Sequence, residues 1–300
     1  MAQFFRKVTE NLLSQDGSLG SGEQRFRDRA WVSLLGVAPL RAYSRLVRAA
    51  AGLPVPERLR PLLWSSLAER LGMDLTEAEL EPAEYPTFAS LFTRRLRAGA
   101  RPGLGPQSAV VSPVDGCVSA VGLADGERLL QAKGMDFSLR ELVGDDSLAD
   151  RLSGGCYITF YLRPKDYHRI HAPLAGRVVS CRRWPGEVFP VQPSFLRYKR
   201  GLFVRNERLV LELETPLGVV AAVFVGAAAV AAISTPFEDG AVTHRRFEPP
   251  IEVDRGAEIG TFNLGSTVIL LFEPDRLELA PLGVGDEVRV GQVVARQDAP

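Results

Sequence analysis

A short turn near the C-terminus carries residue types that suit cleavage of the chain's own backbone. Leu264-Gly265-Ser266-Thr267 leads into the apolar run Val268–Phe272, so a strand is expected to begin at Ser266. Glycine leaves its carbonyl open to approach and tolerates the twisted backbone that attack by the next hydroxyl requires. Gly-Ser-Thr is also ordinary turn chemistry. The motif alone therefore leaves both interpretations open.

Two other segments carry groups that could move a proton. Ser112-Pro113-Val114-Asp115-Gly116 lies between short apolar runs, where Asp-Gly also suits a hairpin. His168 and His171 are two of the three histidines in the chain, and histidine titrates near neutral pH. A metal site is the alternative. The histidines lack the cysteine pair or His-Glu-x-x-His pattern that would favour it, and we predict no metal.

With these segments in view, the chain closely resembles the phosphatidylserine decarboxylases, pyruvoyl-dependent enzymes that make phosphatidylethanolamine. The resemblance spans about residues 85 to 272, and its specificity comes from the order and spacing of several short matches. These are Tyr85–Phe88, Phe92–Arg94, Ala100–Pro102, Ser112–Gly116, Lys133-Gly134, Phe137–Leu139, Tyr161–Pro173, Phe189–Val191, Leu202-Phe203, Asn206–Arg208 and the serine turn.

The resemblance implies self-cleavage between Gly265 and Ser266. The Ser266 hydroxyl would attack the Gly265 carbonyl, His171 matches the family's base, and Asp115 matches the carboxylate that orients it. Elimination, hydration and loss of ammonia would convert Ser266 into an N-terminal pyruvoyl group. The products would be a large subunit, residues 1 to 265, and a small one, residues 266 to 300.

The resemblance also implies the reaction that follows. The pyruvoyl group would form a Schiff base with phosphatidylserine and act as an electron sink while CO2 departs. His168 matches the family residue implicated in this stage, as a proton donor or a substrate-positioning group. One departure puts a substrate contact in doubt, because Gln192 stands where the family commonly has asparagine.

Two other classes of function stay open on the residues alone. A serine hydrolase could use Asp115, His171 and Ser266 on lipid, although the chain lacks the Gly-x-Ser-x-Gly elbow. A non-catalytic module could bind a membrane or partner without needing the histidines. Within the decarboxylase class, another serine-bearing or amino-acid substrate stays open, and so does a homodimer.

Composition fits an enzyme with a sizeable core. The 300 residues are 46% hydrophobic, and 36 basic residues balance 36 acidic ones, which argues against nucleic-acid binding. The three cysteines, Cys117, Cys156 and Cys181, are odd in number and not closely spaced, as in a reducing compartment. The N-terminal residues lack the apolar core of a signal peptide.

Positive charge is concentrated at the N-terminus. Residues 1 to 72 hold eleven Arg or Lys against six Asp or Glu, a net charge of +5, and the rest of the chain carries −5. Leu40, Tyr43, Val47 and Ala50 recur at helical spacing opposite three arginines, which suits an anionic bilayer or packing on the protein itself. A second helix is expected over 57–71, paired with the first. We therefore predict a helical membrane-associating region at 1–72, with a flexible linker at 16–24, and a catalytic domain at 73–300.

The catalytic part reads as short strands and turns, and an α+β fold is expected, mainly a β barrel or sandwich. Residues 173–178 and 284–292 look like strand-turn units of lipoyl- or biotinyl-type barrels. The apolar stretch 217–233 is short for a membrane span, and valine-rich halves around Gly226 favour two buried strands. The protein is thus expected to bind peripherally to the cytoplasmic side of a cell membrane.

Overall fold

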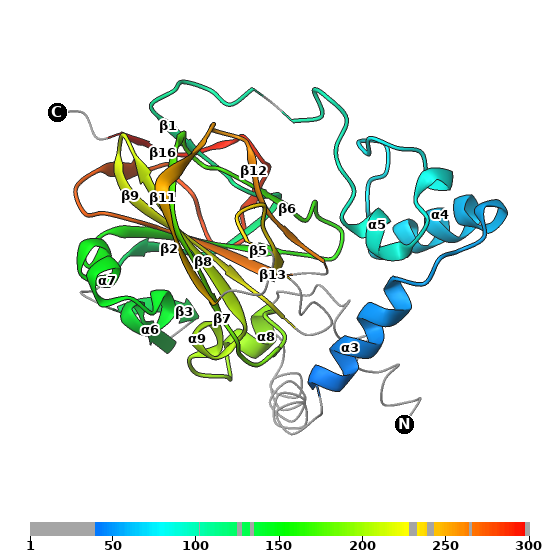
Figure 1. Ribbon diagram of the computed structural model, residues 1–300, viewed down its shortest axis with the longest axis horizontal. Helices are drawn as coiled ribbons and strands as arrows, with labels where there is room; N and C mark the ends of the chain where they lie inside the picture. The colour runs from blue at the N-terminus through cyan, green and yellow to red at the C-terminus, as the bar shows by residue number, and fades with distance from the viewer. Residues whose placement is uncertain are drawn as a thin grey trace.

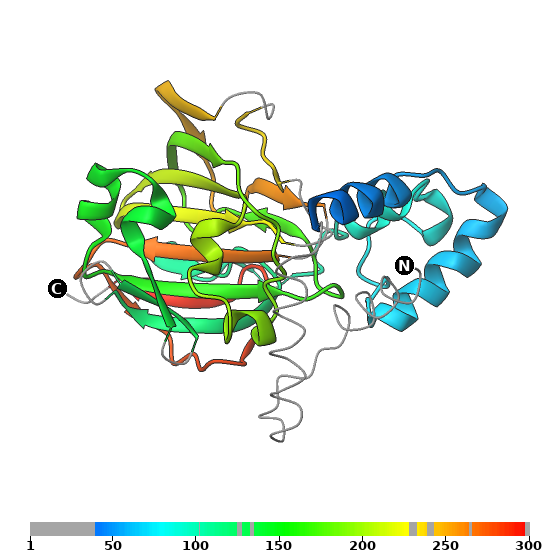
Figure 2. The ribbon, with the colours of Figure 1, turned by 90° about the horizontal axis from the view of Figure 1, so that it is seen from below.

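The computed structural model describes residues 40–101, 103–124, 128–132, 135–227, 233–238, 243–263 and 266–297. The expected linker at 16–24, most of the expected membrane-associating region, and Gly265 lie outside the described residues. The described N-terminal helices stand to one side of a strand-rich body (Figures 1 and 2).

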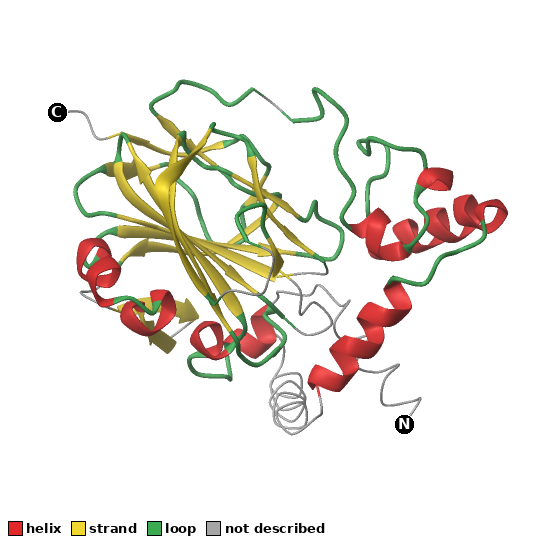
Figure 3. Ribbon diagram, viewed as in Figure 1, coloured by secondary structure: helices red, strands yellow, loops and turns green. Residues whose placement is uncertain are grey.

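Strands predominate in the described chain, and the helices are short (Figure 3). The helices are α3 (Leu40–Ala51), η1 (Glu57–Leu59), α4 (Arg60–Leu71), η2 (Pro82–Glu84), α5 (Phe88–Phe92), α6 (Leu139–Val143), α7 (Asp146–Leu152), α8 (Pro193–Leu196) and α9 (Leu202–Arg205). The first eight strands are β1 (Ala109–Val111), β2 (Gly116–Leu123), β3 (Arg128–Ala132), β4 (Met135–Ser138), β5 (Cys156–Leu162), β6 (Arg169–His171), β7 (Gly176–Trp184) and β8 (Arg208–Thr215). The others are β9 (Gly218–Val225), β10 (Ile233–Ser234), β11 (His244–Val253), β12 (Glu258–Phe262), β13 (Ser266–Phe272), β14 (Leu277–Leu279), β15 (Glu287–Val288) and β16 (Val293–Gln297).

An eight-stranded antiparallel sheet forms the centre of the body, in the order β11-β7-β8-β9-β13-β5-β2-β15. Successive side chains of a strand point to opposite faces, and both faces are buried here. In β9, for example, Val223 packs in one core and Phe224 in the other. This explains why the central strands read as unbroken apolar runs rather than as alternating ones.

Different elements cover the two faces of the large sheet. Helices α6 to α9 and the β3-β4 hairpin pack with the core that contains Val223. The core that contains Phe224 is shared with two three-stranded sheets, β1-β16-β14 and β10-β12-β6. The body is built mainly of β-sheets, with helices on one face of the large sheet, which confirms the predicted α+β, mainly β fold.

The barrel part of the fold prediction is not confirmed. Among the described residues, β11 and β15 stand at the two ends of the large sheet, so its strand pairing is open. The two segments expected to resemble lipoyl or biotinyl units contribute to β7 and β15, which lie far apart in the strand order. They do not form one small barrel together.

The apolar stretch that began at Leu217 forms β9, a buried strand in the middle of the sheet, as predicted for its first half. The second half is only partly described, and Ile233-Ser234 forms β10. Among the residues that can be described, no helix has the length and apolarity to cross a membrane.

Helix α3 packs its apolar side on the protein itself. Leu40 and Tyr43 join the core beneath the helices α6 to α9, and Ala51, rather than the expected Ala50, is buried. The second helical stretch is divided into η1 and α4. Helix α4 packs against η1 and η2 around Trp64. A membrane-associating role for these helices is thus not confirmed by the packing, and the expected pairing of the two helices gives way to contacts with η1 and η2.

Candidate active site

Ser266 begins β13 inside the large sheet. β13 lies between β9 and β5, and Ser266 pairs with Leu162 of β5. The side chain is fully buried, and its Oγ has no hydrogen-bond partner. A buried hydroxyl without a partner is unfavourable and uncommon in native proteins, and Thr267 and Thr159 of the same sheet share this state. The geometry of the Gly265–Ser266 bond lies outside the described residues.

His168 is fully buried just before β6. Its carbonyl accepts a hydrogen bond from Phe262 N at 2.9 Å, which continues the pairing of β6 with β12. The ring packs on Phe92, with 4.1 Å between centroids. Nδ1 lies 2.8 Å from the Asp166 carbonyl and therefore carries the proton, whereas Nε2 has no partner. Burial lowers the His168 pKa to about 3, so the ring is neutral.

Ser266 shares one face of β13 with Val268, and His168 immediately precedes β6, which contains Ile170. Ile170 and Val268 both belong to the core that contains Phe224. Two buried atoms without a partner, His168 Nε2 and Ser266 Oγ, therefore belong to residues of segments that help to build this core.

His171 is the last residue of β6 and lies beside Tyr167. Its Nδ1 donates to the Gly256 carbonyl at 2.7 Å, and Nε2 is 3.0 Å from the Tyr167 hydroxyl, which donates to it. These two bonds fix the tautomer and orientation of the ring. Burial lowers the His171 pKa, although Glu258 and Asp115 oppose the shift by favouring the charged ring. Burial also raises the Tyr167 pKa to about 12.

Asp115 lies in the turn before β2, where its carboxylate is held by two neighbours. Oδ1 accepts from Val290 N at 2.8 Å and from Arg101 Nε at 2.9 Å, and Arg101 Nη2 contacts Oδ2. Arg101 also binds Glu77, at 2.8 Å. Asp115 thus contacts Arg101 and Val290 rather than the His171 ring, and it acts on that ring through its charge.

Several residues of this site are not evident from the serine, histidine and aspartate pattern. Tyr167 and Arg101 fall within the family segments given above. The position of Tyr167, four residues before His171, was the one sign in the sequence that it could hydrogen-bond to this histidine. Gly256 acts through its backbone carbonyl, which no residue type signals. It has a positive φ of 84°, and an added Cβ would lie 3.0 Å from Leu104.

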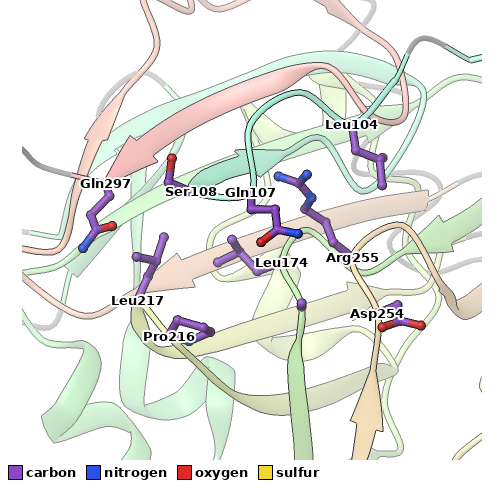
Figure 4. Close-up of a pocket in the computed structure, with 10 residues that line it drawn as sticks. Leu104, Gln107, Ser108, Leu174, Pro216, Leu217, Asp254, Arg255 and Gln297 are labelled. Atoms are coloured by element: carbon purple, nitrogen blue, oxygen red, sulfur yellow. The ribbon is translucent and has the colours of Figure 1, made fainter.

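The turn that holds His171 also borders a pocket of about 500 Å³ (Figure 4). Arg255, one residue before Gly256, donates to the carbonyls of Gly105 and Ala109. None of Asp115, His168, His171 and Ser266 lines this pocket. Within the described ranges, no group of His, Cys, Asp or Glu side chains is arranged to hold a metal ion.

The family model for phosphatidylserine decarboxylase matches residues 88–296, well over half of the chain. The chain is 46% identical over 275 residues to "Phosphatidylserine decarboxylase proenzyme" of Anaeromyxobacter sp. (strain K), covering 88% of this chain and 97% of that protein. It is 43% identical over 257 residues to the proenzyme of the same name from Myxococcus xanthus, covering 83% and 91%. A third proenzyme of that name, from Halorhodospira halophila, is 45% identical over 278 residues, covering 90% and 94%. On these matches, the chain belongs to the phosphatidylserine decarboxylase family.

Proposed function

We propose that this chain is the proenzyme of a phosphatidylserine decarboxylase, which cuts itself before Ser266 and then converts phosphatidylserine to phosphatidylethanolamine and CO2. The observation that carries the proposal is the fully buried, unpartnered Oγ of Ser266 at the head of a central strand. Membership of the family and the proenzyme names of the relatives support it.

Self-cleavage and formation of the pyruvoyl group take place in three stages. The Ser266 Oγ bonds to the Gly265 carbonyl carbon, the C–N bond breaks, and the hydroxyl proton ends on the freed Ser266 nitrogen, leaving an ester. A base then removes the Ser266 α-proton, the Cβ–Oγ bond breaks, and Gly265 leaves as a carboxylate. Water then adds to residue 266, and ammonia departs, which leaves a pyruvoyl group at the new N-terminus.

His171 is our candidate for the base, oriented by its neighbours. Burial keeps the ring neutral at pH 7, and the bond to Gly256 leaves Nε2 as the basic nitrogen. The charges of Asp115 and Glu258 stabilise the ring once it takes a proton. Arg101 and Val290 N keep Asp115 in its place.

His168 is our candidate for positioning the substrate. Burial with a pKa of about 3 makes its protonated form unfavourable, which favours the positioning role over that of a proton donor. Its free Nε2 can accept a hydrogen bond from a donor of the substrate. Ser266 and His168 fit the pyruvoyl group, because both are fully buried and carry a polar atom without a partner. When present, that group supplies a carbonyl that condenses with an amine and withdraws electrons from the α-carbon.

Peripheral membrane binding is the further part of the proposal. Exposed leucines gather on the N-terminal helices and the loops between them: Leu46, Leu53, Leu59, Leu62 and Leu63. Exposed Arg45, Arg58 and Arg70 come from the same elements. This combination of apolar and basic side chains suits an anionic lipid surface. The cysteines are free, as in a reducing compartment, and we therefore place the protein on the cytoplasmic side.

The test is the intact mass of the purified chain under denaturing conditions, beside Ser266→Ala and His171→Ala. Wild type should give fragments that divide between Gly265 and Ser266, the smaller one blocked by a pyruvoyl group. Ser266→Ala should remain at 32.7 kDa and be inactive, and His171→Ala should be cleaved at least about 100-fold more slowly.

His244→Ala is the matched control, because His244 is exposed at the start of β11 and should not affect cleavage. A wild-type chain that stays intact while it decarboxylates phosphatidylserine would rule out the pyruvoyl mechanism. An intact chain with esterase activity would instead support the serine hydrolase.

A further inference from the structure

Arg94 is a buried cation with unsatisfied donors. It follows α5, and its side chain is only 4% exposed. Nη2 makes one long hydrogen bond, 3.4 Å to the Lys165 carbonyl, whereas Nε and Nη1 are buried without a partner. A guanidinium carries five N–H donors, so at least three of its hydrogens are unpaired here. Leaving a charged group in this state is strongly unfavourable unless a ligand satisfies it.

The other two buried arginines of the described chain show what normally happens at such positions. Arg182 binds Asp145 at 2.8 Å and approaches Glu212 at 3.5 Å. Arg208 donates to three backbone carbonyls, those of Glu141, Leu142 and Val204, at 2.6 to 2.7 Å. The other buried guanidinium groups thus have hydrogen-bond partners, whereas Arg94 has donors without partners and is the exception among them.

No carboxylate of the described residues forms a hydrogen bond with Arg94. The acidic groups that act on it electrostatically, without contact, are Asp115, Glu77 and Asp74. Asp115 is bound by Arg101 and Val290 N, and Glu77 is bound by Arg101 and Arg289. These carboxylates act on Arg94 only through space, and its Nε and Nη1 donors remain without an anionic partner.

Arg94 belongs to the neighbourhood of His168. Phe92, two residues earlier, packs on the His168 ring at 4.1 Å between centroids. Arg169 Nε donates to the Thr93 carbonyl at 2.9 Å, which ties this segment to β6. The charge of Arg94 also contributes to the low pKa of His168. The unpartnered donors of Arg94 and the unpartnered Nε2 of His168 are therefore parts of one region.

We propose that Arg94 binds the phosphodiester of the substrate headgroup. The proposal rests on the decarboxylase function proposed above and names the group that recognises its substrate. A phosphodiester carries one negative charge and accepts charge-assisted hydrogen bonds from guanidinium. The substrate carboxylate is the other anion, but it leaves as neutral CO2. A cation held against it would stabilise the ground state more than the transition state and slow the reaction.

The first experiment needs no variant. With processed wild-type enzyme and phosphatidylserine in mixed micelles, glycerophosphoethanolamine should inhibit competitively, at least about 30-fold more strongly than ethanolamine. The first compound keeps the phosphodiester, and neither has a carboxylate. Equal inhibition by both would overturn the proposal. Inorganic phosphate that inhibits as strongly as glycerophosphoethanolamine would also overturn it, because Arg94 would then recognise free phosphate rather than the headgroup.

The second experiment compares Arg94→Gln and Arg94→Lys with Arg95→Gln, the adjacent and exposed arginine. The substrates are glycerophosphoserine and O-hexylserine, which lacks the phosphate. Arg94→Gln should lose about 10- to 100-fold in kcat/KM on glycerophosphoserine, mainly through KM, and less than about threefold on O-hexylserine. Arg94→Lys should lose less, and Arg95→Gln should match wild type. Equal losses on both substrates, or none, would overturn the proposal.

Self-cleavage is measured first in every variant by intact mass, and rates are divided by the concentration of processed enzyme. If wild type itself fails to decarboxylate phosphatidylserine, the proposed function fails. If wild type is active and the preference for the phosphodiester is unchanged in Arg94→Gln, only the inference about Arg94 fails.

Discussion

His168 and His171 are three residues apart, yet burial and neighbours make them different bases. His168 is enclosed, with a pKa of about 3, and its Nε2 has no hydrogen-bond partner. His171 is partly exposed, has both nitrogens bonded, and responds to two carboxylates. The sequence predicts that both matter, but not their different surroundings, because these depend on which elements pack on each ring, Phe92 on His168 and Tyr167 on His171. Their catalytic roles stay predictions.

Tyr167→Phe tests the orientation of His171. The tyrosine hydroxyl stabilises the neutral ring by donating to Nε2, so its removal should raise the His171 pKa. In wild type the cleavage rate should fall to half at a pH below 6.5, because burial lowers the His171 pKa. The midpoint should move upward in Tyr167→Phe, and the rate at pH 8 should fall about tenfold because the ring is less well held.

The measurement is cleavage of freshly synthesised chain, followed by intact mass from pH 5 to 8. The charged groups that act on this ring, Asp115, Glu258 and Arg169, are unchanged in the variant. Tyr198→Phe, a partly buried tyrosine elsewhere in the fold, is the control and should keep the wild-type profile. An unchanged midpoint in Tyr167→Phe would show that the hydroxyl does not tune His171.

At the level of elements, the strands were more predictable than the N-terminal helices. β9 and β13 follow from their unbroken apolar runs, which suit strands buried on both faces. The stretch 57–71 was expected as one helix, yet α4 begins only at Arg60. Pro61 lacks a backbone N–H and is tolerated in the first turn, so a helix start there is favoured. The open sheet could not be predicted, because it depends on strand order rather than on any one strand.

Gly256→Ala tests the turn between β11 and β12. Alanine at a φ of 84° is strained, and we expect relief of that strain to move the turn together with the carbonyl that holds His171. We expect a loss of about 2 kcal/mol in the free energy of unfolding, measured by urea in the uncleaved Ser266→Ala background, and slower cleavage in the wild-type background.

Gly99→Ala is the matched control for that substitution. Gly99 has a similar φ of 79°, but nothing lies within 4 Å of an added Cβ, and no contact with His171 is involved. It should lose about 1 kcal/mol and cleave at the wild-type rate. Equal cleavage rates in the two variants would show that the turn at Gly256 does not influence self-cleavage.

At the scale of the whole molecule, an apolar and basic helical unit adjoins a layered body that holds the candidate site (Figure 2). The charge asymmetry in the sequence predicts a membrane-facing region. The packing of α3 on the body could not be predicted, because an amphipathic pattern does not say whether lipid or protein covers its apolar side. The exposed leucines of α4 and its flanks are the better candidates for lipid contact.

Leu62→Glu/Leu63→Glu tests that surface. Both leucines are exposed, so the double variant should keep wild-type stability and self-cleavage. Binding to vesicles of phosphatidylglycerol and phosphatidylethanolamine, measured by co-sedimentation, should fall at least about tenfold, since two apolar anchors become charged. Val284→Glu changes an exposed apolar residue between β14 and β15, outside the helices, and should bind as wild type does. Equal binding by all three proteins would place the membrane contact elsewhere.

The position of β13 has a consequence for the lifetime of the enzyme. A cut before Ser266 would leave a 35-residue chain that supplies β13, β14, β15 and β16 to two different sheets. Once cut, the protein can recover from denaturation only if two chains find each other again, and its apparent melting temperature should depend on concentration. The processed enzyme would behave as a single-use assembly that is made in one piece, kept intact by slow unfolding, and replaced rather than repaired.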